Sequence, residues 1–164
     1  MTTKNFIGVT LWGAAGVPAS NAAVGGFDDL TWVQLKGHQS LPVFGVSHSN
    51  IDVEDLSTGF ASGVKGMGSG RDTTFTYHGD GADTGITNAI TAADGDQGLF
   101  SLRIARGSGT DVGNGPAIET GDVVSYAQGY LHSHELNAGS GSSNQGGTIN
   151  FKQNAVAIAG TVPA

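Results

Sequence analysis

The 164-residue sequence contains no cysteine. This absence excludes a disulfide framework, a thiolate nucleophile and a cysteine-ligated metal site. Long hydrophobic runs are missing as well, because no segment approaches the roughly 18 apolar residues of a membrane span. The opening stretch, MTTKNFIGVT, has neither the basic start nor the apolar core of a signal peptide. We therefore expect a soluble chain that folds as a single domain over residues 1–164.

Basic residues are also few, with 7 lysines and arginines against 14 aspartates and glutamates. The resulting isoelectric point is about 4.9. A surface that grips nucleic acid is normally basic, because its affinity comes from neutralising phosphates. We therefore expect no tight binding of DNA or RNA.

Glycine, in contrast, is abundant, with 28 residues where ordinary usage gives about 11 or 12. The glycines follow no G-X-Y period, which excludes collagen. Together with serine, threonine and alanine they separate short β-rich segments. This pattern is typical of a β-sandwich or barrel with many turns.

Two segments with period-two alternation, 121–136 and 97–106, form the predicted centre of the fold. The first would reach roughly 45 to 50 Å as a strand, beyond the usual length, and so requires a long partner. We predict that the two pair as antiparallel strands, with 107–121 as their connection. Within 97–106, one face carries Phe100, Leu102 and Ile104. Within 121–136, one face carries Val124, Tyr126, Gln128, Tyr130 and His132.

The remaining segments predict a mainly β fold, an antiparallel β-sandwich or open barrel with one short flanking helix. The helix covers about 86–93, with Asp83 or Thr84 as N-cap and Gly95 at its end. An N-terminal arm covers about 1–27. Further strands are expected at 4–12, 28–36, 44–54, 71–78 and 148–158.

The segment 55–70 is predicted to be a long flexible loop. It contains five glycines and only isolated apolar residues, Phe60, Val64 and Met67. Loops longer than about 12 residues are uncommon unless they are functional. We therefore expect this loop to contact a neighbouring subunit.

Three groups of residues could carry chemistry, and each favours a structural interpretation. His132 and His134, followed by Glu135, could bind zinc, but no third ligand has suitable spacing. The segment 79–85 resembles a single calcium-binding turn, and such turns work in tandem arrays. The acidic pairs Asp28/Asp29, Asp52/Glu54 and Asp94/Asp96 lie in polar surroundings that do not raise a pKa. We therefore predict no enzyme, no metal and no cofactor.

The order of segments over residues 44–158 resembles a known family. The segments read HSNIDVEDL, a glycine-rich stretch, RDTTFTYHGD, TNAITAAD, QGLFSLRIAR, GDVVSYAQGYLHSHEL and TINFKQN. In this order they look like the major tail tube protein of a bacteriophage with a long, non-contractile tail of the siphovirus type. The inner tubes of contractile tails and secretion machines share that fold.

The resemblance implies a structural virion protein. Six copies would form a ring, and rings would stack into a tube that conducts genome DNA during ejection. The partners would be other copies of the chain, the tape-measure protein and DNA in the lumen, and the tail terminator and tail-tip proteins. Assembly would take place in the host cytoplasm, without a membrane. The acidic composition suits such a conduit, because like charges keep phosphates off the wall.

The resemblance also assigns expected roles to residues. The ring-stacking loop would use Phe60, Val64, Lys65 and Met67. The inner-barrel strands would contribute Phe100, Leu102, Ile104, Val124, Tyr126 and Tyr130. The acids of the lumen or the outer surface would be Asp52, Glu54, Asp72, Glu119, Asp122 and Glu135.

Two other function classes stay open from the sequence. A glycine-rich β-sandwich could be a binding module, such as a decoration, fibre or lectin-like domain, with Trp12 and Trp32 as sugar platforms, although their apolar neighbours favour burial. A metal-dependent enzyme using His132 and His134 is the third class.

Overall fold

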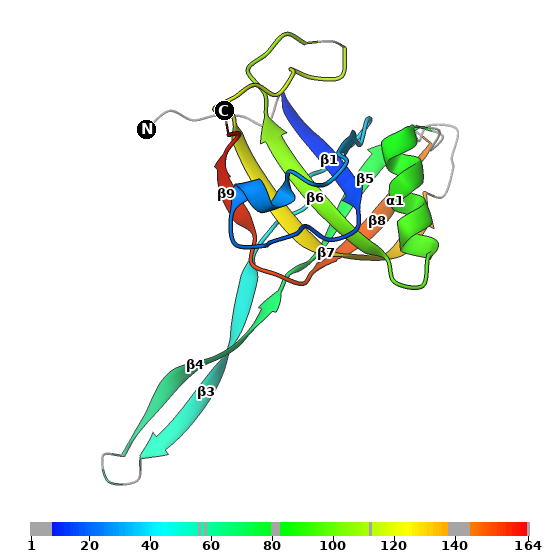
Figure 1. Ribbon diagram of the computed structural model, residues 1–164. Coiled ribbons are helices and arrows are strands. Elements are labelled where there is room, and N and C mark those ends of the chain that lie inside the picture. Colours follow the sequence, from blue (N-terminus) through cyan, green and yellow to red (C-terminus); the bar gives the residue numbers. More distant parts are fainter. Residues whose placement is uncertain are drawn as a thin grey trace.

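The computed structural model describes residues 8–163, with gaps at 56, 58, 80–82, 112 and 138–144, and without the side chains of Asp55 and Phe60. Figure 1 shows a curved antiparallel sheet, a helix beside it and a hairpin that extends away from both. The elements are β1 (Val9–Ala15), the 3-10 helix η1 (Val24–Phe27), β2 (Val33–Gln34), β3 (Val46–Asp55), β4 (Phe60–Gly70), β5 (Asp72–His78), α1 (Thr84–Asp94), β6 (Leu99–Arg106), β7 (Val123–Leu136), β8 (Gly146–Gln153) and β9 (Ile158–Thr161). None of the helices in the described part of the chain is long and apolar enough to cross a membrane.

The 14-residue strand β7 is the centre of the main sheet. One of its edges pairs with β6, from Leu99 opposite Tyr130 to Arg106 opposite Val123. Its other edge pairs first with β9 and then with β8. The predicted central pair is therefore confirmed. The sheet continues outward in the order β2-β1-β6-β7-β8-β5.

The sheet curls but does not close by strand pairing. The segment 33–39, which begins with the edge strand β2, connects β1 to β5 at the other edge, since the Leu35 amide donates to the Leu11 carbonyl of β1 at 2.9 Å and the His78 amide of β5 donates to the Gly37 carbonyl at 2.9 Å. This arrangement is an open barrel, as predicted. The bridging segment also protects backbone groups on both edges from pairing with other chains.

Apolar side chains pack on both faces of the sheet, which explains why most strands are apolar at successive positions. The first cluster lies between the sheet and α1 and contains Leu11, Leu35, Phe75, Tyr77, Ile86, Ala89, Phe100, Leu102, Ala127, Leu131, Ile149 and Phe151. The second lies on the opposite face and contains Phe27, Ala105, Val124 and Tyr126, with Trp12, Trp32 and Ile158 packed against it.

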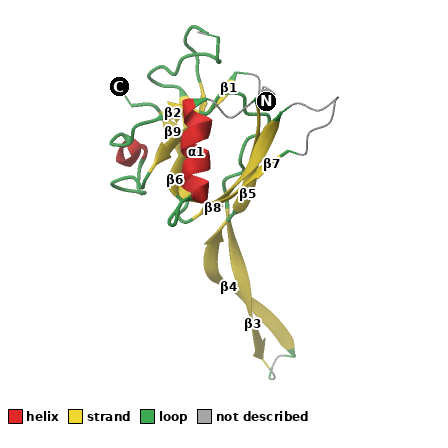
Figure 2. Ribbon diagram, turned by 90° about the vertical axis from the view of Figure 1, so that its right-hand side faces the viewer, coloured by secondary structure: helices red, strands yellow, loops and turns green. Residues whose placement is uncertain are grey.

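The helix α1 forms where the sequence predicts it, with one extra turn (Figure 2). The Asp83 side chain caps it by accepting the amides of Gly85 at 3.0 Å and Ile86 at 3.3 Å. Gly95 ends the helix, and its amide donates to Ala92. Ile86 is buried toward the sheet, as the apolar spacing requires.

Three predicted boundaries are wrong. The strand expected at 4–12, within the arm over 1–27, is β1 at 9–15, which lies in the sheet between β2 and β6, with apolar side chains that meet a core on each face. The strand expected at 28–36 is reduced to the two residues of β2. The strand expected at 148–158 ends at 153, and β9 follows after a break.

The flexible loop expected over 55–70 is also wrong, because residues 60–70 form strand β4, which pairs with β3 along its length. Four of the five glycines that suggested a loop, all in β4, are positions where another group comes close. A Cβ atom at Gly63 would lie 2.5 Å from the Asn50 Oδ1 atom, and one at Gly70 would collide with the Gln153 carbonyl. Glycine inside a strand often marks such close approach.

Candidate functional site

The β3–β4 hairpin has an apolar face that is exposed in the subunit. Ile51 lies directly opposite Val64, and Val53 lies two residues further along β3 on the same face. Their exposed fractions are 53% for Ile51, 52% for Val64 and 45% for Val53. Figures 1 and 2 show the hairpin extending from the sheet, so its own subunit leaves this face open. A contiguous exposed apolar surface of this kind marks an interaction site.

The opposite face of the hairpin is polar. Asn50 lies opposite Lys65, and Asp52 and Glu54 follow on the same face. All four side chains are exposed, and the Asn50 amide donates to the Asp52 carboxylate. The hairpin is therefore amphipathic. Of the predicted ring-stacking residues, Val64 belongs to the apolar face and Lys65 to the polar one.

Met67 lies at an irregularity in the hairpin. Between the paired residues His48/Gly68 and Asn50/Lys65, β4 has two residues, Gly66 and Met67, against Ser49 alone in β3. The extra residue makes this a β-bulge. Met67 is 87% exposed. Phe60 opens β4, but its side chain lies outside the described residues.

A second exposed surface is the polar outer face of β5, β8 and the C-terminal half of β7. The Thr74 hydroxyl donates to Asn150 at 2.7 Å, and the Asp72 Oδ1 atom lies 3.1 Å from His132 Nε2. Glu135 of β7 is exposed on the same face, opposite Thr148. Of the six predicted acids, Asp72 and Glu135 lie on this surface, Asp52 and Glu54 on the hairpin, and Glu119 in an exposed loop.

Asp122, the sixth acid, is buried, so its assignment to the lumen or outer surface is wrong. Its Oδ2 atom accepts the amides of Glu119 at 2.7 Å and Ser108 at 2.9 Å. These bonds hold the pKa of the Asp122 carboxyl below its ordinary value, and the bond from the Glu119 amide has the largest effect. The carboxylate therefore fastens both ends of the 107–121 connection at the start of β7.

Asp122→Asn is expected to lower the melting temperature at neutral pH. A carboxyl with a depressed pKa stabilises the fold above its unfolded pKa of about 4, and this contribution is lost as pH falls through the lower folded pKa. The difference from the parent protein should therefore shrink below about pH 4. Thermal unfolding followed by circular dichroism across pH measures it, with Glu119→Gln as the exposed control. A difference independent of pH would contradict this role.

The predicted inner-barrel residues pack mainly inside the subunit. Phe100 and Leu102 belong to the first core cluster, and Ile104 packs at its rim. Val124 and Tyr126 belong to the second cluster. Tyr130 is half-buried. Phe100, Leu102 and Ile104 therefore lie on one face of the sheet, and Val124 and Tyr126 lie on the other. A pore formed by β6 and β7 stays a prediction.

Trp12 and Trp32 enclose Arg103 instead of forming an exposed platform. The guanidinium carbon lies 4.7 Å from the Trp12 ring centroid and 4.9 Å from that of Trp32. Burial lowers the pKa of the Arg103 guanidinium, and among the described residues its Nε atom has no hydrogen-bond partner. Both indole N–H groups are used internally, by Thr10 at 2.9 Å and the Phe27 carbonyl at 3.1 Å. The sequence offered no signal for this cage.

The histidine pair does not form a metal site. The register of β7 shifts between Leu131 and Ser133, so His132 is an extra residue in the strand. His132 faces Asp72 on the polar surface, whereas the His134 Nε2 atom lies 2.9 Å from the Tyr77 hydroxyl beside the core. Over the described residues, no three histidine or acidic side chains are placed to hold a metal.

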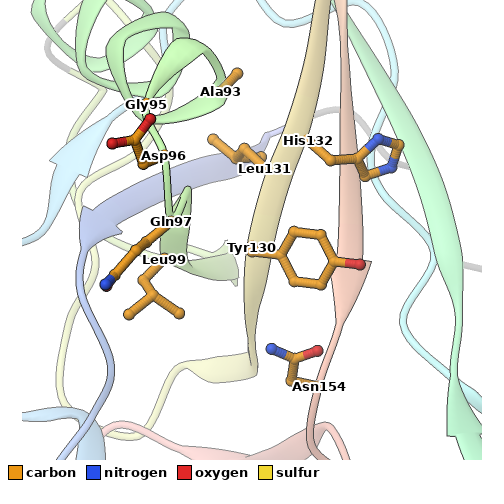
Figure 3. A pocket seen from close by; sticks show the side chains of 9 residues that line it. All are labelled: Ala93, Gly95, Asp96, Gln97, Leu99, Tyr130, Leu131, His132 and Asn154. Atoms are coloured by element: carbon orange, nitrogen blue, oxygen red, sulfur yellow. The ribbon is translucent and has the colours of Figure 1, made fainter.

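The other candidate chemistry is dispersed. The acidic pairs at 28/29, 52/54 and 94/96 are exposed, and part of the segment 79–85 lies outside the described residues. An open depression of about 520 Å³ lies between the end of α1 and β7. Figure 3 shows its polar side chains on two sides of the β7 ribbon, Asp96 and Gln97 on one and Tyr130 and His132 on the other. They do not converge on a common point.

The fold is that of tube proteins and tube terminators. No known protein family matches the sequence, and no curated protein sequence matches it. Among solved structures, the sheath/tube terminator of the extracellular contractile injection system PVC matches with 9% identity and a TM-score of 0.62 over 98% of both chains. The SPP1 tail tube matches with 14% identity and a TM-score of 0.59, over 95% of this chain and 78% of that one. The chain from the PVC sheath-tube complex matches with 12% identity and a TM-score of 0.57, over 93% of this chain and 88% of that one. The resemblance expected from the sequence is thus confirmed for the fold.

Proposed function

We propose that this chain is a structural subunit that assembles with copies of itself into stacked rings and so forms a tube. The observation that carries the proposal is the projecting hairpin, whose apolar face of Ile51, Val53 and Val64 has no cover in its own subunit. The fold shared with the SPP1 tail tube and the PVC sheath-tube complex supports it. A contact between two different patches either closes into a ring or repeats along an axis, and a tube of stacked rings requires contacts of both kinds.

In a phage tail this tube would be the conduit for genome DNA, and its unit would be the hexameric ring that the resemblance implies. The low content of lysine and arginine supports a wall that DNA passes without tight binding. The other partners of the proposal are the tape-measure protein inside the lumen and the terminator and tail-tip proteins at the ends. The chain would then act by assembly, without catalysis.

A terminator ring at the end of a tube is the second candidate. It is favoured by the similarity to the PVC sheath/tube terminator over 98% of both chains and to the tube-terminating cap of the anti-feeding prophage at a TM-score of 0.59. No comparable observation favours a sugar-binding module, because both tryptophans pack around Arg103.

Negative-stain electron microscopy of the purified chain, over a range of protein and salt concentrations, tests the proposal. A tube subunit should form hollow tubes or stacked rings with a central hole. Single rings that do not stack would support the terminator instead. A chain that stays monomeric at every concentration, as measured by light scattering, would contradict both.

A further inference from the structure

We infer that the apolar groove between residues 38–43 and the end of β6 is the receptor site for the hairpin of a second copy of this chain. The inference rests on the proposed function and deepens it by naming the surface that the hairpin occupies. The groove has a volume of about 610 Å³. It is lined by His38, Gln39, Ser40, Leu41, Pro42, Val43 and Ile104.

The groove is an opening onto the main core. Leu41 and Ile104 both pack against the first core cluster, so an apolar side chain that enters the groove extends that core. Val43 stands at its edge, more than half exposed. Burial of apolar surface is the main favourable term when such surfaces meet.

The wall of the groove is held in place before any partner binds. The Val43 amide donates to the Thr73 hydroxyl at 2.9 Å, and the Thr76 amide donates to the Ser40 hydroxyl at 2.9 Å. Both bonds fasten the wall to β5. A preformed site loses little conformational entropy on binding.

The hairpin matches the groove in chemistry. Ile51, Val53 and Val64 carry no charge, and His38 is the one titratable side chain in the groove lining. Contact between the two surfaces therefore buries no carboxylate, ammonium or guanidinium group, which would be costly. The acids Asp52 and Glu54 lie on the opposite face of the hairpin and can stay in solvent.

The occupant is a second copy because the hairpin extends away from its own sheet, as both views show (Figures 1 and 2). Groove and hairpin are different patches of one chain. Their contact is therefore heterologous, and each copy that docks presents a new groove or a new hairpin to the next.

Cysteine pairs test the contact directly, since the parent sequence has no cysteine. Val43→Cys is combined with Ile51→Cys or with Val64→Cys, and the assembled protein is oxidised mildly and run on a non-reducing gel. A disulfide requires Cα atoms within about 7 Å. We expect a ladder of dimers, trimers and larger species for at least one of these pairs. The matched control, Val43→Cys with Glu54→Cys on the polar face, should give no ladder.

A charge exchange provides an independent readout. Val43→Lys and Val64→Glu should each prevent assembly, and the two together should restore it. Intact tubes without any ladder, or a ladder that is equally strong with Glu54→Cys, would overturn the groove while leaving the proposed function standing. A monomeric crosslink between Val43→Cys and Phe6→Cys would assign the groove to the N-terminal segment of the same chain. Failure of the unmodified parent protein to assemble would instead contradict the proposed function.

Discussion

Val64→Asp is expected to abolish tube formation without unfolding the subunit. Val64 is about half exposed in the isolated chain, so the substitution should change the folding free energy by no more than about 0.5 kcal/mol. In the proposed assembly the same position would be covered by another copy, and an uncompensated buried carboxylate costs at least about 3 kcal/mol. The concentration needed for assembly should therefore rise roughly a hundredfold or more. Sedimentation and negative-stain microscopy over a concentration series measure this rise.

The polar face of the hairpin supplies the control for this experiment. Glu54→Gln removes a charge from that face and adds no apolar surface, so tubes should form as in the parent protein. Equal melting temperatures of both variants and the parent would establish that folding is intact. Tubes of Val64→Asp at the concentration that suffices for the parent would refute the role of the apolar face.

The elements best predicted from the sequence are those whose pattern is decided locally. The alternation in 97–106 and 121–136 identified both segments as long strands, because successive side chains of a strand point to opposite faces, and β6 and β7 pair as predicted. The helix predicted at about 86–93 from its apolar spacing forms as α1 at 84–94, with Asp83, one of the two predicted caps, at its start and Gly95 at its end. The resemblance to tube proteins followed from the order of these elements and is confirmed for the fold.

The second strand of the hairpin was missed because glycine is common both in loops and at strand positions where another group comes close. In 55–70 the glycines looked like loop residues, yet Gly63 and Gly70 are strand positions. The Asn50 side chain lies close to Gly63, and the Gln153 carbonyl leaves no room for a side chain at Gly70. Such crowding comes from β3 and β8, which are distant from any local window. The side chains of Ile51 and Val53, which complete the apolar face, alternate clearly in the sequence but could not be assigned a partner before the register was known.

The candidate side chains show the same limit. His132 and His134 are two residues apart and would share a face in a regular strand, but the bulge at His132 separates them. The neighbours of Asp122 in the sequence are those of an ordinary surface acid. Its hydrogen bonds from the Ser108 and Glu119 amides form only in the folded chain. A bulge and a long connection both depend on tertiary pairing, which the local pattern does not contain.

Phe100→Ala is expected to give the largest loss of subunit stability. Phe100 is fully buried in the first core cluster, and removing a buried phenylalanine ring costs about 3–5 kcal/mol. For a domain of this size the melting temperature should fall by about 6–20 °C. Chemical denaturation and thermal unfolding measure the loss. Tubes should still form well below the new melting temperature, because Phe100 faces the interior of the subunit and not the hairpin.

The glycine that faces this ring makes the prediction sharper. A Cβ atom at Gly13 would lie 2.5 Å from the Phe100 ring and 2.8 Å from Leu35 Cδ1, so Gly13→Ala overpacks the core of the parent protein by about 1–3 kcal/mol. In the Phe100→Ala background the ring is gone, and of these two close contacts the methyl group keeps only the one with Leu35. The two substitutions should therefore couple by at least about 0.5 kcal/mol in a double-mutant cycle. If the changes in unfolding free energy of the two substitutions simply add, direct packing of β1 against β6 at this point is contradicted.

The tube assay of Phe100→Ala tests a separate point, that the core determines folding and the hairpin determines assembly. Loss of tubes at low temperature in Phe100→Ala would contradict this separation.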